Sequence, residues 1–125
     1  MKNILPKFKF KTDAVVLNAP AALSKEFVDL GCTTSFDKKI KSQATLAFVN
    51  DKKEFIHFLK TQLKFIEPDG VLWFAYPKQT SGIKTDINRD KLWEFAAEYG
   101  IRPVSAISID DTWSGLRFRP IDKVK

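Results

Sequence analysis

The sequence predicts a single-domain α/β protein, a three-layer sandwich in which helices cover both faces of a mostly parallel sheet that ends in an antiparallel hairpin. Short apolar runs of strand length alternate with segments that have the apolar spacing of helices. Several of these runs contain almost no polar residue, which is typical of parallel strands buried on both faces. The last two runs are separated only by a short acidic turn, which indicates a hairpin.

The composition fits one domain with a substantial core. The chain has 125 residues, of which 44% are hydrophobic and 13% aromatic. A chain of this length buries roughly two-thirds of the surface that its unfolded form exposes, so it needs no disulfide or metal to fold. One cysteine and one histidine exclude a metal site built from several such ligands. We divide the chain into a basic N-terminal arm, residues 1–13, and one α/β domain, residues 14–125.

The arm and the first elements have clear local patterns. Phe8 and Phe10 alternate with lysines, which is the period of a strand with one apolar face, and we expect the arm to lie on the domain or on a neighbouring molecule. Residues 14–18, AVVLN, form a short apolar strand. Residues 21–30 then form a helix, which Gly31 ends.

The middle of the chain predicts two further strands and a helix. Residues 33–36 form a second short strand, and residues 44–49, ATLAFV, form a third. Asn50 supplies the N-cap of a helix with lysines on its outer face. The apolar face of that helix carries Phe55, Phe58, Leu59, Leu63 and Ile66. The triplet Pro68-Asp69-Gly70 then turns the chain into a strand over residues 71–76.

The C-terminal part begins with a polar loop after Pro77. Asp86 or Asn88 caps the next helix, whose apolar spacing ends at Gly100 and which buries Leu92, Phe95, Ala96 and Tyr99. Residues 104–109 and 112–118 are two strands joined through Asp110-Asp111, close enough for a hairpin.

An open parallel sheet that ends in an antiparallel hairpin resembles the Rossmann-like fold of class I S-adenosylmethionine-dependent methyltransferases. The segment EPDGVLWFAYPK, residues 67–78, resembles a turn and the following strand of those enzymes. The resemblance spans residues 14–119 and implies a sheet order of 33–36, 14–18, 44–49, 71–76, 112–118 and 104–109. The phrases YPKQTSG, TDINRD and DDTWSGLRF resemble more closely a family of small single-domain proteins of unknown function, which implies a fold and no activity.

The loop after the first strand departs from the methyltransferase pattern. In those enzymes a Gly-rich loop lets the backbone approach the cofactor, and an acidic residue after the second strand holds the ribose hydroxyls. Here no glycine lies between Asp13 and Leu30, so each position that needs a positive φ costs about 1–2 kcal/mol, and Cβ atoms stand where the cofactor lies. Asp37 is near the expected acidic position. We therefore expect no cofactor and no methyltransferase activity, in a chain that also looks too short for substrate-binding insertions.

Ligands of open α/β sheets bind beyond the carboxyl ends of the strands. The polar loop over residues 76–86 leads into a helix N-terminus, which suits a phosphate or carboxylate, although the same residues also suit an ordinary solvated turn. The loop lacks the G-x-x-x-x-G-K-[ST] spacing of nucleotide triphosphatases. The candidate ligand-binding residues are Asn18, Asp37, Asn50, Lys78, Ser81, Lys84 and Thr85.

Four further side chains have a functional and a structural interpretation. Trp113 and Arg117 share one face of the last strand and are secondary candidates, although simple packing is the favoured interpretation of Trp113. His57 has no nucleophile and acid spaced for a triad, so we expect a surface or boundary histidine. Cys32 is most simply a small buried residue.

The formal net charge of +6 is concentrated at the two ends of the chain and favours an anionic partner or a solvated lysine-rich surface. We carry three hypotheses. The first is a non-enzymatic module that binds a small anionic ligand or a protein partner. The second is a divergent S-adenosylmethionine-dependent transferase that uses the 78–86 loop and Asp37. The third is nucleic-acid association through the basic ends, with Phe8, Phe10 and Trp113 available for stacking.

The expected location is the cytoplasm. The N-terminal residues have no apolar run typical of a signal peptide, and no stretch approaches the ~20 apolar residues of a membrane span. We therefore expect no membrane partner.

Overall fold

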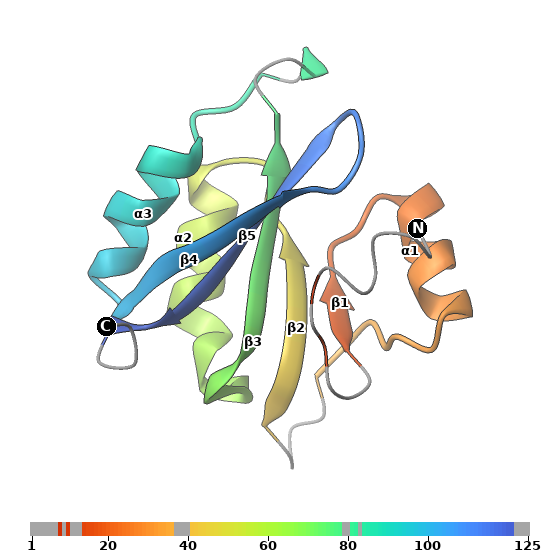
Figure 1. The fold of residues 1–125 in the computed structure, drawn as a ribbon, viewed down its shortest axis with the longest axis horizontal. Coiled ribbons are helices and arrows are strands. Elements are labelled where there is room, and N and C mark those ends of the chain that lie inside the picture. The colour runs from red at the N-terminus through yellow and green to blue at the C-terminus, as the bar shows by residue number, and fades with distance from the viewer. Residues whose placement is uncertain are drawn as a thin grey trace.

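The structure, a computed structural model, describes residues 8, 10, 14–36, 41–78, 81–82 and 84–121, apart from the side chains at 68 and 69. In this part of the chain five strands form one sheet in the order β1-β2-β3-β5-β4 (Figure 1). The parallel strands are β1 (Val15–Leu17), β2 (Ser42–Phe48) and β3 (Ile66–Pro77). The antiparallel strands are β4 (Ile101–Ser108) and β5 (Trp113–Pro120). The predicted fold class is confirmed, and so is the order of these five strands.

The predicted strand over residues 33–36 is wrong beyond its first residue. Only Thr33 pairs with the sheet, through an isolated parallel bridge to Val15. The side chains at 33, 34 and 35 are exposed, so the segment has no buried face that would hold a longer strand against β1.

Three helices and a short 3₁₀ turn, η2 (Leu63–Phe65), connect the strands. The helix α1 (Ala21–Asp29) ends before Gly31, which takes a positive φ of 94°. The helix α2 (Lys52–Thr61) is capped by Asp51, whose carboxylate accepts a hydrogen bond from the Glu54 amide at 2.9 Å. The prediction that Asn50 is the N-cap is therefore wrong by one residue.

The third helix, α3 (Arg89–Ala97), is capped by Asn88, whose side-chain oxygen accepts from the Lys91 amide at 2.9 Å. This settles the predicted choice between Asp86 and Asn88. Leu92 and Ala96 are buried by this helix, as predicted, while Phe95 and Tyr99 are half-buried.

The strand β3 starts earlier than predicted. Ile66, expected on the apolar face of the preceding helix, is its first residue, and the 68–70 triplet expected to form a turn lies within it. The partner of Ser42 is Ile66 whereas the partner of Ala44 is Val71, so residues 67–70 form a bulge. A Cβ on Gly70 would lie 3.1 Å from the backbone oxygen of Gln43, which explains why glycine fits at this close approach.

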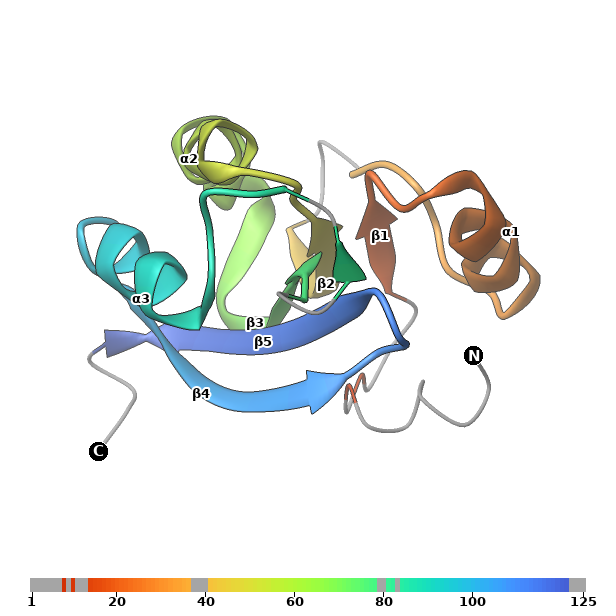
Figure 2. The ribbon, with the colours of Figure 1, turned by 90° about the horizontal axis from the view of Figure 1, so that it is seen from above.

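The sheet separates two apolar layers. The helices α2 and α3 cover one face, while α1 lies on the other side of β1 (Figure 2). Phe55 and Phe58 of α2 and Leu92 of α3 pack against Phe74 and Phe118 of the sheet. On the opposite face the core contains Phe27 of α1, Phe48, Trp73 and Trp113, and also Phe8 from the N-terminal arm.

The N-terminal arm contacts the domain through its two described residues. Phe8 is 0% exposed, has a 3₁₀ conformation and stacks on Phe10 at 5.3 Å between ring centroids. The indole N–H of Trp73 donates to the Phe8 carbonyl at 2.9 Å. The alternation of Phe8 and Phe10 therefore does not reflect a strand at Phe8, and both rings lie on the body of the protein.

Candidate functional site: a groove at the carboxyl ends of β1 and β2

The turn after β1 contains the only described residue other than glycine that has a positive φ. Asn18 has φ = 61°, in the left-handed region. Asparagine tolerates this region better than other residues that carry a Cβ, so it provides a turn for which related folds use glycine. The free-energy cost expected from the missing glycines therefore arises at one described position, Asn18, whose side chain suits the left-handed conformation.

The strength of this requirement is testable by substitution. Asn18→Ala is expected to lower the free energy of unfolding by roughly 1–2 kcal/mol, because alanine pays the full left-handed penalty. Asn18→Gly is expected to remain more stable than Asn18→Ala, since glycine adopts a positive φ freely. Urea unfolding of the two variants measures the difference. Equal stability of the two would show that the turn does not need this backbone conformation.

An open groove of about 630 Å³ lies between this turn and α2. Leu17, Asn18 and Ala19 form one wall. The other wall is a stripe on the start and one face of α2, with the three-to-four-residue spacing of helical neighbours, and it consists of Asn50, Glu54, His57, Phe58 and Gln62. The groove therefore combines three apolar side chains, Leu17, Ala19 and Phe58, with amide, carboxylate and imidazole groups.

The carboxylate of Glu54 has a fixed position in this wall. The backbone N–H of Asn50 donates to Oε1 at 3.1 Å, and the Asn50 side-chain amide donates to the same oxygen at 3.2 Å. Together with the Asp51 cap, these bonds form an arrangement similar to a capping box. A carboxylate accepts about four hydrogen bonds, so Glu54 keeps capacity for donors of a ligand.

The structure brings two of the predicted site residues together. Asn18 and Asn50 both line the groove. Asp37 lies outside the described residues. Neither Pro20 nor Tyr76 is among the lining residues, so neither fills the groove.

The polar loop after β3 is tied to other parts of the protein. The ammonium group of Lys78 donates to Ser108 Oγ at 2.6 Å, and its backbone N–H donates to the Thr112 carbonyl at 2.8 Å. Ser81 Oγ donates to the Lys78 carbonyl at 2.6 Å. These contacts hold Lys78 and Ser81 near the β4–β5 hairpin, and Lys84 is exposed and is not part of the groove wall.

Thr85 and Asp86 connect the loop to α2. Thr85 Oγ1 donates to the Asn50 carbonyl at 2.6 Å. The Asp86 carboxylate accepts from the Lys52 backbone N–H, at the first turn of α2, at 2.7 Å. Asp86 therefore accepts a hydrogen bond from a free backbone N–H at the N-terminus of α2, and it does not cap α3. Thr85 does not line the groove, but it holds the backbone of Asn50, which does.

Both secondary candidates lie on β5. Trp113 is 6% exposed, and its ring meets Phe48 edge-on at 5.0 Å, which supports the packing interpretation. Arg117 is half-buried on β5, directly opposite Trp73 of β3. His57 is exposed, as predicted, and Cys32 is buried, as predicted.

Tyr76, the first residue of the predicted 76–86 loop, lies at the end of β3. Burial raises the pKa of its hydroxyl, and this effect exceeds the opposing effects of the Arg89 guanidinium and of a hydrogen bond with Ser114. The phenol therefore stays protonated at neutral pH and acts as a hydrogen-bonding group at the end of β3.

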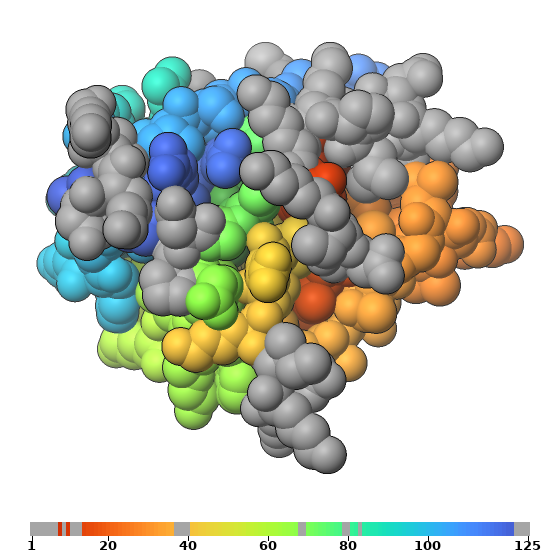
Figure 3. Space-filling view, turned by 60° about the horizontal axis from the view of Figure 1, so that its bottom comes forward, coloured from red at the N-terminus to blue at the C-terminus, as the bar shows by residue number. Residues whose placement is uncertain are grey.

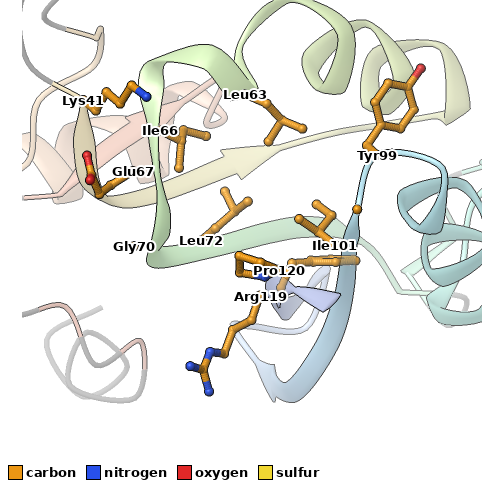
Figure 4. A pocket seen from close by; sticks show the side chains of 12 residues that line it. Lys41, Leu63, Ile66, Glu67, Gly70, Leu72, Tyr99, Ile101, Arg119 and Pro120 are labelled. Carbon is orange, nitrogen blue, oxygen red and sulfur yellow. The ribbon is translucent and has the colours of Figure 1, made fainter. Parts of the chain in front are cut away.

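A second, smaller cavity of about 270 Å³ lies at the opposite edge of the sheet. The first residues of β2 and β3 and the last residues of β5 meet on this face (Figure 3). Leu63, Ile66, Leu72 and Ile101 surround the cavity, with Lys41 and Glu67 at one end (Figure 4). Its lining is mainly apolar, and it lies far from the edge at which ligands of this architecture bind.

Two other classes of site find no support in the described residues. No group of three His, Cys, Asp or Glu side chains there is placed to hold a metal ion. None of the helices in the same residues is long and apolar enough to cross a membrane.

The solved structures similar to this chain are S-adenosylmethionine-dependent methyltransferases and related proteins. A ribosomal protein L11 methylase from Lactobacillus delbrueckii subsp. bulgaricus has a TM-score of 0.53 at 15% identity, over 88% of this chain and 58% of that one. A candidate type 11 methyltransferase from Sulfolobus solfataricus has a TM-score of 0.57 at 11% identity, over 95% and 90%. A SAM-dependent methyltransferase from Aquifex aeolicus has a TM-score of 0.54 at 11% identity, over 94% and 87%.

These likenesses confirm the methyltransferase-like fold. No protein-family model matches the sequence, and no curated protein is significantly similar to it. The chain spans only 58% of the L11 methylase but 90% and 87% of the other two structures. Its length alone therefore does not separate it from proteins that carry the name methyltransferase.

Proposed function

We propose that this protein binds a small molecule in the groove between the turn after β1 and α2, and that the ligand presents hydroxyl or ammonium donors. The observation that carries the proposal is the open groove with a fixed carboxylate, Glu54, opposite the left-handed Asn18. A neutral or cationic ligand fits this wall better than the anion expected from the sequence, because the groove is lined by Glu54 and by no lysine or arginine among the described residues.

S-adenosylmethionine is the first ligand to test. It carries a ribose diol, an ammonium group and a positive sulfonium, which suit a carboxylate and neutral amides. The two reasons for excluding it were costly left-handed positions and crowding Cβ atoms. They are weakened because Asn18 takes the left-handed position and because the groove beside the turn is open. Asn18, Asn50 and Glu54 would hold it, and it would supply an activated methyl group.

Isothermal titration tests the binding and its chemistry. The unaltered protein is expected to bind S-adenosylmethionine, and Glu54→Gln is expected to weaken binding roughly tenfold or more, because a hydrogen bond to a charged group contributes about 1.5–3 kcal/mol. Glutamine keeps the capping arrangement, so the melting temperature should change little. Glu94→Gln removes the same charge from the exposed surface of α3 and should leave binding unchanged.

Two results would contradict the proposal. One is the absence of binding by the unaltered protein to S-adenosylmethionine, S-adenosylhomocysteine and adenosine alike. The other is equal loss of affinity in the Glu54 and Glu94 variants, which would point to net charge rather than to the groove.

A divergent methyl transferase is the second candidate, and it is favoured by the two similar structures of nearly equal length that are named methyltransferases. Binding without methyl transfer remains the leading proposal, because the two lysines expected to serve the transfer do not line the groove. Lys78 is hydrogen-bonded to Ser108, and Lys84 is not among the lining residues. Release of S-adenosylhomocysteine in the presence of acceptor molecules separates the two candidates. Such turnover, lost in Glu54→Gln, would favour the transferase.

A further inference from the structure

The cavity near the starts of β2 and β3 has an apolar floor and a charged rim. Ile66, Leu72 and Phe118 are at most 6% exposed and form the floor. Lys41 and Glu67 are exposed and lie together at one end of the cavity (Figure 4). A concave apolar surface with a few polar groups that orient a ligand is the usual form of a small-molecule site.

The cavity lies on the side of the sheet that α2 and α3 cover. Leu72 and Phe118 belong to the apolar layer beneath those helices. The described arm residues, Phe8 and Phe10, pack in the opposite layer, so they do not occupy the cavity. Its volume of about 270 Å³ is slightly below the range of about 300–1,000 Å³ that is typical of pockets for drug-sized ligands. The cavity therefore suits a ligand with a short apolar part.

The bulge in β3 forms one wall of the cavity. Residues 67–70 have no partner on β2 in the register of the two strands. Both ends of the bulge, Glu67 and Gly70, line the cavity. Bulges are frequent beside functional sites, because they re-aim a side chain away from the regular alternation of a strand. Here the bulge places Glu67 at the same end of the cavity as Lys41 (Figure 4).

The two charges at the rim have no partners within the protein. Among the described residues, no hydrogen bond or ion pair involves the side chain of Lys41 or that of Glu67. Arg119 also lines the cavity, but it has an interaction of its own and its side chain points away (Figure 4), so it takes no part in the site. An ammonium and a carboxylate at one end of an apolar cavity are complementary to a ligand that carries both charges.

We propose that this cavity binds a free α-amino acid with a short apolar side chain, such as leucine. The ammonium group of Lys41 binds the ligand's carboxylate, and the carboxylate of Glu67 binds the ligand's ammonium group. The apolar side chain of the ligand is buried against Ile66 and Leu72. A simple carboxylate or a simple amine fits less well, because its single charge also lies near a like charge on the rim. This site lies at the opposite edge of the sheet from the groove and does not depend on the function proposed for it.

Titration of isotope-labelled protein with L-leucine, followed by amide chemical shifts, tests the site, because this measurement detects weak binding. Saturable shifts are expected around the cavity, at Gly70, Gly100 and Ile101. The dissociation constant should lie in the millimolar range, because two exposed charge contacts add little to the burial of one small side chain. L-Alanine, which buries fewer carbon atoms, should bind at least about tenfold more weakly.

Two analogues of leucine test the two charges separately. Isocaproate lacks the ammonium group and isoamylamine lacks the carboxylate, and each should bind about two- to fivefold more weakly than leucine. Glu67→Gln should remove the preference for leucine over isocaproate, and Lys41→Gln should remove the preference for leucine over isoamylamine. Lys25→Gln with Glu26→Gln on the exposed surface of α1 is the matched control, and it should change neither preference.

Leu63→Phe tests the place of binding. Leu63 is half-buried on η2 and lines the cavity, so a larger ring there should fill part of it and weaken leucine binding at least about tenfold. Leu23→Phe makes the same change at a half-buried position of α1, in the opposite layer, and should leave binding unchanged. If Leu63→Phe does not fold, Leu63→Ala replaces it; this variant widens the cavity and should shift the preference from leucine toward L-phenylalanine.

Three outcomes would overturn the proposal. The first is the absence of saturable shifts around the cavity at millimolar concentrations of leucine. The second is equal binding of leucine, isocaproate and isoamylamine to the unaltered protein, which would mean that the charges on the rim do not recognise the ligand. The third is leucine binding that does not change in either Leu63 variant, which would place the ligand elsewhere.

Discussion

Phe74→Ala is expected to lower the free energy of unfolding by about 3–5 kcal/mol, one of the largest losses that a single substitution produces in this chain. Phe74 is 0% exposed at the centre of the layer beneath α2 and α3. Its ring meets those of Phe55, Phe58 and Phe118 edge-on, at centroid distances of 4.8, 5.1 and 5.4 Å. Its removal leaves a cavity among rings that come from α2 and β5, which cannot close without moving both.

Urea unfolding followed by circular dichroism measures this loss as a lower midpoint with an unchanged slope. Phe65→Ala removes the same atoms from a half-buried position on η2, where the ring contacts Phe36 at 5.6 Å, so it should cost clearly less. Phe74→Leu fills much of the cavity and should cost an intermediate amount. Similar losses at positions 74 and 65 would contradict the central place of Phe74 in the core.

Most of the strands were predictable because their signals are local, whereas their order in the sheet was implied by the resemblance to the methyltransferase fold. Apolar runs such as ATLAFV mark a buried strand, and Asn88 and Gly100 mark the ends of α3 by well-known capping chemistry. The start of β3 was not predictable in the same way. The triplet at 68–70 has the composition of a turn, but the backbone forms a bulge there because Gly70 allows a close approach to Gln43 on the neighbouring strand, a contact that no local pattern contains.

The candidate site was predictable in part. Asn18 and Asn50 follow the ends of strands, and in this architecture the carboxyl ends of strands meet at one edge. Glu54 and Gln62 were missed, and His57 was expected only as a surface or boundary residue, because only the tertiary arrangement places this face of α2 against the turn after β1. The available signal was their spacing from Asn50, which puts them on one stripe.

The lysine-rich N-terminal arm contains a ring, that of Phe8, which is buried in the core. In the sequence, residues 1–13 are set apart from the domain by their many lysines, and that division remains a prediction. The contacts of Phe8 give it a sharp test. Its ring is 0% exposed, meets the Trp73 ring edge-on at 5.4 Å, and its carbonyl is the acceptor for the Trp73 indole N–H.

Phe8→Ala is therefore expected to lower the free energy of unfolding by about 3–5 kcal/mol, as for a phenylalanine in the middle of a core. Loss of the ring also exposes the Trp73 indole to water, so the tryptophan emission of the folded variant should shift to longer wavelength. Phe10→Ala is the matched control, because Phe10 is only half-buried and stacks on Phe8, and it should cost less. A loss below about 1 kcal/mol in Phe8→Ala would mean that the arm contributes little to the stability of the domain. The full loss would mean that Phe8 is a core residue, although it lies before the first strand and helix of the domain.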